Sequence, residues 1–217
     1  MLICTWMFVM SGTASIGRRV ALKTPSAAAK VARDGDVVEI EPGLYAGDTA
    51  VWTQNGLTIR AVGGRPHLRA DGAQVEGKGI WVIKGAGTTI EGLEFSGAKV
   101  PELNGAAIRL EGPGLTVRNS YFHDNENGIL TGVNPVSDIV IERSEFARNG
   151  FGDGYSHNLY IGRARSLTVR FSYLHRAVVG HNLKSRAQTN DIRYNRIVDR
   201  AATNAVDARI AKAGALR

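Results

Sequence analysis

Short apolar phrases with one shared pattern recur along this chain. Each phrase has a β-branched residue, four intervening positions and a large apolar residue. Successive copies are 27, 24, 28 and 23 residues apart, and their β-branched residues are Ile90, Val117, Ile141, Val169 and Ile192. The phrases are rich in Val, Ile, Thr, Phe and Tyr, and Gly, Asn, Asp or Pro falls between them, which indicates strands and turns. A strand repeat of about 20–30 residues is typical of a solenoid.

The repeat predicts strands that stack on one another. No stretch between Val37 and Val198 has the roughly 3.6-residue period of a helix, and one unit is too short to bury its own apolar residues. A second set of phrases occupies corresponding places in three units: Asn127-Gly-Ile129, His157-Asn-Leu159 and His181-Asn-Leu183. We expect the aliphatic residues of both sets to stack inside, with asparagine ladders at the turns. The sequence therefore predicts one solenoid of about seven coils.

The segment Ala27–Tyr45, AAAKVARDGDVVEIEPGLY, predicts a short Ala-rich helix with Thr24 as its N-cap, then a strand and a turn. It resembles the common opening of right-handed parallel β-helix proteins of the pectate-lyase-like superfamily, and the resemblance extends from Thr24 to Asp199. It implies an all-β fold, a right-handed parallel β-helix with a short N-terminal capping helix over the open first coil. Because this superfamily includes lyases, hydrolases, epimerases and phage or adhesin spikes, the resemblance implies the fold more strongly than the chemistry.

The N-terminal segment, residues 1–23, lies outside the β-helix domain predicted for residues 24–199. Met1–Met10 is apolar but too short to span a bilayer. It is either a signal-like segment before the small residues Ser11–Ala14, a strand that caps the solenoid, or the product of a mis-set start codon. The superfamily resemblance implies export, which would place the protein outside the cell, in the periplasm or in the cell envelope.

The C-terminal tail, residues 200–217, leaves the repeat pattern. Val206, Ile210 and several alanines predict a weakly amphipathic helix with Thr203 as its N-cap. Two interpretations stay open. The tail caps the last coil, or the chain is a truncated form of a longer β-helix, since members of the superfamily generally have several more coils.

The composition of the chain indicates more about its binding partners than about its fold. The chain has 217 residues, of which 43% are hydrophobic, and this suits one domain with its own core. The net charge of +7 favours an acidic partner, although a basic chain can also owe its charge to solubility alone. Nucleic acid is disfavoured because aromatic residues are few and no recognition motif occurs, and no membrane span is expected. The single cysteine, Cys4, excludes an intrachain disulfide framework.

Alternation along the last strands predicts an exposed polar surface. If Leu159 and Leu183 point inward, their neighbours in the strands point outward. Cations suit a uronate carboxylate, an aromatic ring suits a sugar face, and amides suit hydroxyl groups, so the surface fits an anionic polysaccharide. The residues assigned to substrate binding are Asn158, Tyr160, Arg163, His181 and Asn182, beside Lys184 and Arg186. The alternative is a solvated sheet face whose cations only discourage edge pairing.

Lys184-Ser185, with Asn190, Ile192-Arg193 and Asn195 after it, resembles the Lys-Ser…Asn-x-Ile-Arg-x-Asn pattern of alginate and dermatan lyases of this fold. The resemblance implies that Lys184 removes the proton next to the uronate carboxylate, and the neighbouring cation Arg186 favours a neutral amine. Lys184 and Arg186 are therefore the predicted catalytic residues. Those lyases hold calcium with a Glu-x-Glu pair before the lysine, where this chain has Ala177–Val179, and their arginine on the next coil has only Arg209 as a substitute.

Other chemistries of the fold fit less well. Polygalacturonase-type hydrolysis needs paired carboxylates, and no Asp-Asp occurs in the chain. His157 and His181 are predicted to be turn residues that bond to the neighbouring coil, because two histidines without a carboxylate or cysteine make a poor metal site.

No cofactor is expected. Calcium was considered, but Asp124, Asp138 and Asp153 lie on different turns and give no convincing ligand set. Variation in a solenoid is carried by its turns, so Val133–Ser137 and Gly150–Ser156 are the predicted binding loops. The function inferred is binding or lyase-type β-elimination of an anionic polysaccharide, and the alternative is a non-enzymatic surface or structural module.

Overall fold

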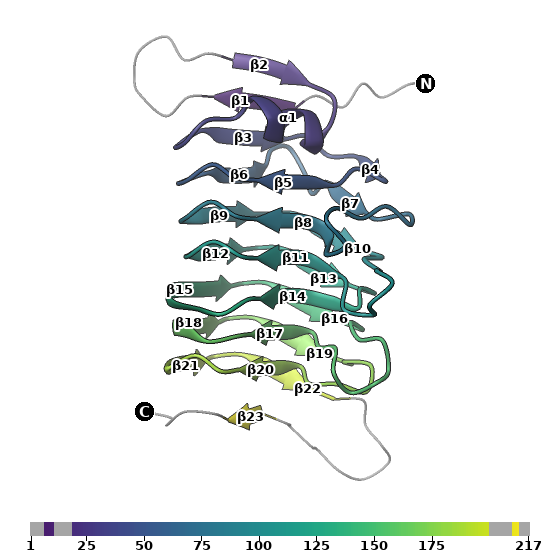
Figure 1. The fold of residues 1–217 in the computed structure, drawn as a ribbon, viewed down its shortest axis with the longest axis vertical. Helices are drawn as coiled ribbons and strands as arrows, with labels where there is room; N and C mark the ends of the chain where they lie inside the picture. The colour runs from purple at the N-terminus through teal and green to yellow at the C-terminus, as the bar shows by residue number, and fades with distance from the viewer. Residues whose placement is uncertain (1–6, 11–18, 200–209, 213–217) are drawn as a thin grey trace.

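The protein is a right-handed parallel β-helix of about six turns in a computed structural model, which describes residues 7–10, 19–199 and 210–212. Three sheets follow its long axis, and each coil adds one strand to each sheet (Figure 1). Sheet A has nine strands, and sheets B and C have seven each. The predicted all-β solenoid is confirmed, with slightly fewer turns than the expected seven coils.

The strands of sheet A, in sheet order, are β2 (Arg19–Leu22), β1 (Met7–Met10), β3 (Val37–Ile40), β6 (Thr58–Ala61), β9 (Thr88–Glu91), β12 (Leu115–Arg118), β15 (Asn134–Glu142), β18 (Ala164–Arg170) and β21 (Thr189–Arg193). Sheet B contains β4 (Leu44–Ala46), β7 (His67–Arg69), β10 (Glu94–Ser96), β13 (Tyr121–His123), β16 (Glu145–Ala147), β19 (Tyr173–His175) and β22 (Arg196–Val198). Sheet C contains β5 (Ala50–Trp52), β8 (Gly79–Ile83), β11 (Ala106–Leu110), β14 (Asn127–Thr131), β17 (Leu159–Ile161), β20 (Leu183–Ser185) and β23 (Ile210–Lys212).

The repeated β-branched residues form one column in the core, as the sequence predicted. Adjacent strands of sheet A pair Ile90, Val117, Ile141, Val169 and Ile192 in direct register. The first four side chains are fully buried, and Ile192 packs against the core while partly exposed. In sheet B the large apolar residues form a second column, in which the rings of Phe95, Phe122 and Phe146 stack nearly in parallel. Stacking of like residues removes apolar surface from water that no single coil could bury.

Hydrogen-bonded side chains fill the corner between sheets B and C. Asn125 Nδ2 donates a hydrogen bond to Asn149 Oδ1, and Asn149 Nδ2 donates to Asn158 Oδ1. Asn158 Nδ2 donates in turn to Asn182 Oδ1, and the three bonds are 2.7–2.9 Å long. Asn182 donates to Asp199 in turn. This is the predicted asparagine ladder, and it satisfies backbone groups that the bend takes out of the sheets.

The N-terminal end is closed by a helix and two strands. Helix α1 (Pro25–Val31) begins after Thr24, whose Oγ1 accepts a hydrogen bond from Ala27 N over 3.2 Å, as predicted. The helix contacts β1, β2 and β5 (Figure 1). Strand β1 pairs antiparallel with β3 and β2, so residues 7–10 form a strand that caps the solenoid. Whether the N-terminal segment also directs export stays a prediction.

Two predictions about local structure are wrong. The helix expected to include Ile210 is absent there, because Ile210–Lys212 pairs with β20 and extends sheet C. The open edge of a sheet has unpaired backbone groups, and a short added strand forms hydrogen bonds with them. Thr203 and Val206 of the expected helix lie outside the described residues. Val133–Ser137 was expected to be a loop, but β15 begins at Asn134 and pairs with β18.

No helix among the described residues is long and apolar enough to cross a membrane.

Candidate functional site

The outer face of sheet C is partly exposed in its last two coils. On this face Val82 and Leu130 are buried, whereas Val51, Arg109, Tyr160 and Lys184 are partly exposed. Strands β17 and β20 pair Tyr160 directly with Lys184, while Leu159 and Leu183 on either side of the pair point into the core. The alternation predicted from the sequence therefore holds inside these two strands.

Two cations lie against the ring of Tyr160. Lys184 Nζ is 5.0 Å from the ring centroid and Arg186 Cζ is 5.8 Å from it, both within the range of a cation–π contact. Neither cation has a carboxylate partner among the described residues. We call His157, Tyr160, His181, Lys184 and Arg186 the Lys184 patch.

His157 is the buried member of the Lys184 patch. Its Nδ1 accepts a hydrogen bond from the backbone N–H of His181 over 3.1 Å, which confirms the predicted bond between neighbouring coils. Its Nε2 lies 3.2 Å from Lys184 Nζ, and its ring meets Tyr160 edge to face. Burial, followed by the nearby charges of Lys184 and His181, lowers the pKa of His157 to about 4. The imidazole is therefore neutral at neutral pH.

Gly180 allows this close approach of two coils. A Cβ atom at this position would lie 2.0 Å from the carbonyl oxygen of Ser156 and 3.1 Å from His157 Nδ1. Any side chain would push the coils apart and break the bond between His181 and His157. The Gly-His-Asn phrase thus positions the Lys184 patch through its glycine as well as through its polar residues.

The predicted outward orientation of Asn158 and Asn182 is wrong. Both residues are almost completely buried in the ladder at the corner between sheets B and C. Strict alternation applies only inside a strand, and both asparagines precede their strands at a bend, where the side chain turns inward. They hold the coil together and cannot contact a polymer. Arg163 is exposed in the turn after β17, as expected.

A pocket of about 670 Å³ lies at the outer side of the same corner, lined by Asp124, Arg148, Arg176 and Ala177–Val179. Arg148 binds both carboxylate oxygens of Asp124 over 2.7 and 2.9 Å, and this pairing lowers the pKa of Asp124. Arg176 has no carboxylate partner among the described residues. The pocket therefore offers one free guanidinium to an anionic group.

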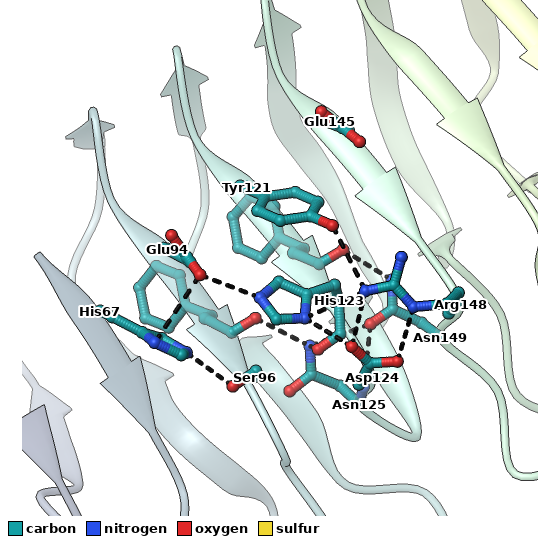
Figure 2. Close-up of polar contacts among 12 residues, drawn as sticks. His67, Glu94, Ser96, Tyr121, His123, Asp124, Asn125, Glu145, Arg148 and Asn149 are labelled. Carbon is teal, nitrogen blue, oxygen red and sulfur yellow. Dashed lines mark hydrogen bonds and ion pairs between the residues drawn. The ribbon is translucent and has the colours of Figure 1, made fainter. Parts of the chain in front are cut away.

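A second polar cluster on the outer face of sheet B was missed by the sequence reasoning. His67, Glu94 and His123 come from the adjacent strands β7, β10 and β13, and one ligand atom from each lies within 4.8 Å of the others (Figure 2). Burial lowers the pKa of His67, although the Glu94 carboxylate opposes this shift. The signal was present in the sequence, since these residues flank the apolar positions Leu68, Phe95 and Phe122, which pair in register.

The carboxylates considered for calcium do not converge. Asp124 binds Arg148, Asp138 pairs with Arg165 and Ser166, and Asp153 accepts hydrogen bonds inside the loop at Tyr155 and Ser156. Asp153 is held within its own loop, whereas Asp124 and Asp138 are held by residues of the next coil.

Comparison with known proteins supports the fold. A protein-family model described as a right handed beta helix region matches residues 43–207, which is more than half of the chain. No curated protein and no solved structure matches the chain. The matched range contains both polar clusters and every coil from β4 to β22. A β-helix fold is consistent with roles that involve polysaccharides. The chain belongs to the right-handed β-helix family.

Proposed function

We propose that the Lys184 patch binds an anionic polysaccharide and that Lys184 acts as the base of a β-elimination. The observation that carries the proposal is the contact of Lys184 Nζ with His157 Nε2 at 3.2 Å, beside the partly exposed ring of Tyr160 and the guanidinium of Arg186, which has no carboxylate partner among the described residues. A solvated sheet face would not require a buried histidine behind its lysine.

The distribution of ion pairs supports an anionic ligand. On sheet A the guanidinium groups of Arg60, Arg118 and Arg193 are paired with carboxylates of the solenoid. Lys184 and Arg186 have no such partner among the described residues, so their charges are free for a ligand. Tyr160 supplies an apolar face between them, and such a surface suits a sugar ring with a carboxylate.

The hydrogen bonds of His157 suggest how Lys184 could act as a base. A neutral imidazole whose Nδ1 accepts a hydrogen bond carries its hydrogen on Nε2. That hydrogen points at Lys184 Nζ. A neutral amine accepts this hydrogen bond through its lone pair, whereas an ammonium group has no lone pair and can only donate. In the proposed step Lys184 acts as the neutral amine, and this contact gives that form a hydrogen-bond donor.

The proposed step needs no group beyond the polymer. Lys184 Nζ takes the proton from the carbon next to the uronate carboxylate, and the C–H electrons form a carbon–carbon double bond. The glycosidic C–O bond breaks, and the leaving oxygen takes a proton from solvent. A guanidinium near the carboxylate stabilises the charge that develops there, and Arg186 is placed for this role. Export to the cell envelope or beyond would bring the protein to such polymers.

A binding-only module is the second candidate, and Ala177–Val179 favours it. These apolar residues line the neighbouring pocket where the lyases that the chain resembles carry an acidic pair. In this version the patch holds the polymer and no bond breaks.

Incubation with alginate, pectate and glycosaminoglycans distinguishes the two candidates. Unsaturated uronate ends are followed by absorbance, and polymer binding is followed by affinity electrophoresis. If Lys184 is the base, Lys184→Ala lowers turnover by roughly 10²–10⁴-fold, and Lys184→Arg does not restore it because a guanidinium stays protonated. If the patch only binds, no unsaturated ends form, and Lys184→Arg retains most of the affinity that Lys184→Ala loses.

Arg143→Ala is the matched control, because Arg143 is exposed and also lies over an aromatic ring, that of Phe171, at 5.7 Å. It should change neither binding nor turnover. Absence of binding and of product with every uronan, with and without calcium, would reject both candidates.

A further inference from the structure

We propose that His67, Glu94 and His123 form a binding site for one divalent transition metal ion of the zinc class, with a coordination position left open. The site lies on sheet B, whereas the Lys184 patch lies on sheet C. The metal site therefore does not depend on the proposed polysaccharide function.

The distances suit a metal after small movements. Glu94 Oε1 lies 3.1 Å from His123 Nε2 and 3.7 Å from His67 Nδ1. Bonds of about 2.0–2.1 Å to a tetrahedral zinc place neighbouring ligand atoms about 3.3 Å apart. Two imidazoles and one carboxylate are a donor set that zinc accepts, with solvent or a ligand in the fourth position. All three side chains are partly exposed, so an ion can reach them.

The groups behind the ligands hold the rings in the orientation that a metal needs. His123 Nδ1 bonds to Asp124 Oδ2 over 2.6 Å, and Arg148 fixes that carboxylate (Figure 2). With its hydrogen on Nδ1, the His123 ring directs the lone pair of Nε2 at Glu94. His67 Nε2 bonds to Ser96 Oγ over 2.7 Å, which leaves Nδ1 for the ion. A carboxylate or hydroxyl behind a ligating histidine is the usual support of a metal site.

The lone pair of His123 Nε2 faces Glu94 Oε1 at 3.1 Å, and these two groups repel each other. A cation between them removes this repulsion. The geometry is therefore built around a positive charge at this point.

The solenoid contains a comparison set two coils further on. Tyr121, Glu145 and His175 occupy the corresponding strand positions, and His175 Nε2 lies 3.0 Å from Glu145 Oε1. Here a tyrosine replaces the first histidine. His175 Nδ1 has no hydrogen-bond partner, and the residue that follows His175 is Arg176, where Asp124 follows His123. Each set has a tyrosine ring stacked on its histidine, so that stacking is a feature of the repeat. The third ligand and the supporting carboxylate occur only in the first set.

Titration of the tag-free, chelator-treated full chain tests the site. Zn²⁺ binding is measured by calorimetry, and Co²⁺ binding by its visible absorption. We expect one ion per chain, with His67 and His123 as the histidines whose ¹⁵N resonances shift on addition of Zn²⁺. Loss of a supporting group costs about 10–100-fold in metal affinity, so we expect Asp124→Asn to weaken binding in that range. His123→Gln, which removes a ligand, should weaken binding by roughly 100-fold or more.

His175→Gln is the matched control and should leave the affinity unchanged. His67→Gln serves as a second ligand variant, since a partly exposed residue on a strand surface tolerates the change, and circular dichroism verifies the fold of each protein. The proposal is overturned if the wild-type chain binds no ion saturably, if folded His123→Gln and His67→Gln bind as tightly as wild type, or if Zn²⁺ shifts only the resonances of other histidines.

Discussion

At the scale of single residues, the contact between His157 and Lys184 depends on one ring hydrogen. His157 accepts from the His181 backbone at Nδ1 and faces Lys184 at Nε2. Protonation of the ring would remove the acceptor and place a second positive charge beside Lys184. Burial of the ring, followed by the nearby charges of Lys184 and His181, disfavours the protonated form, and the pKa of His157 falls to about 4.

We predict that His157 makes stability depend on pH between about 6.5 and 4. The unfolded chain binds a proton on this side chain below about pH 6.5, whereas the folded chain does so only near pH 4. Unfolding therefore takes up a proton in this window, and the free energy of unfolding falls as the pH falls. After allowance for solvent screening, His157→Gln should remove about 1–2 kcal/mol of the loss between pH 7 and pH 4.5. Urea denaturation at several pH values measures it, and parallel curves for the two proteins would contradict the assignment.

At the scale of elements, the corner between sheets B and C relies on hydrogen bonds that pass from coil to coil. Asn158 accepts from both the backbone N and the Nδ2 of Asn149, and it donates to Asn182 and to the carbonyl oxygen of His175. Its side chain joins the corner between β16 and β17 to the corner between β19 and β20 in the next coil. The bend gains a fixed geometry because the amides of Asn125, Asn149, Asn158 and Asn182 each donate and accept hydrogen bonds.

Asn158→Ala should lower the free energy of unfolding by about 2–4 kcal/mol, because it removes four hydrogen bonds to buried groups of Asn149, Asn182 and His175. Arg163→Ala in the exposed turn after β17 is the control, and we expect it to change stability by less than about 0.5 kcal/mol. Chemical denaturation monitored by circular dichroism gives both values. A loss for Asn158→Ala no larger than for the control would show that the ladder is not needed.

At the scale of the whole molecule, stability depends on contacts between neighbouring coils. In the middle coils the inward residues are fully buried, as Val117 and Ile141 are. In the last coil Ile192 and Ile197 are only partly buried. A solenoid whose coils contact only their neighbours is therefore expected to open more readily where this burial is least.

Hydrogen exchange should report this gradient. We predict that amides of β12 and β15 exchange more slowly than amides of β21 and β22, because opening the last coil exposes little buried surface. Exchange measured by mass spectrometry on peptides from the intact chain resolves the strands. Equal protection of β12 and β22 would indicate that the described solenoid unfolds as one cooperative unit.

The sequence by itself determined the coil and most of its interior. Ile90, Val117, Ile141 and Val169 recur at the length of one turn, and a chain that repeats strands at this spacing can bury them only by stacking. The Ala-rich segment after Thr24 predicted the α1 cap, and the alternation of residues between core and solvent inside a strand predicted that Tyr160 and Lys184 point outward.

The tertiary structure alone decided what happens at bends and between strands. Asn158 and Asn182 turn inward because a corner between two sheets does not follow the alternation of a strand. Ile210 joins sheet C because the edge of β20 needs backbone partners, which an isolated helical pattern does not reveal. His67, Glu94 and His123 converge because the register of β7, β10 and β13 brings together side chains that are 27 and 29 residues apart in the chain. Register is a property of the paired strands, so each segment read separately does not show that these three side chains meet, although each flanks an apolar position of the repeat.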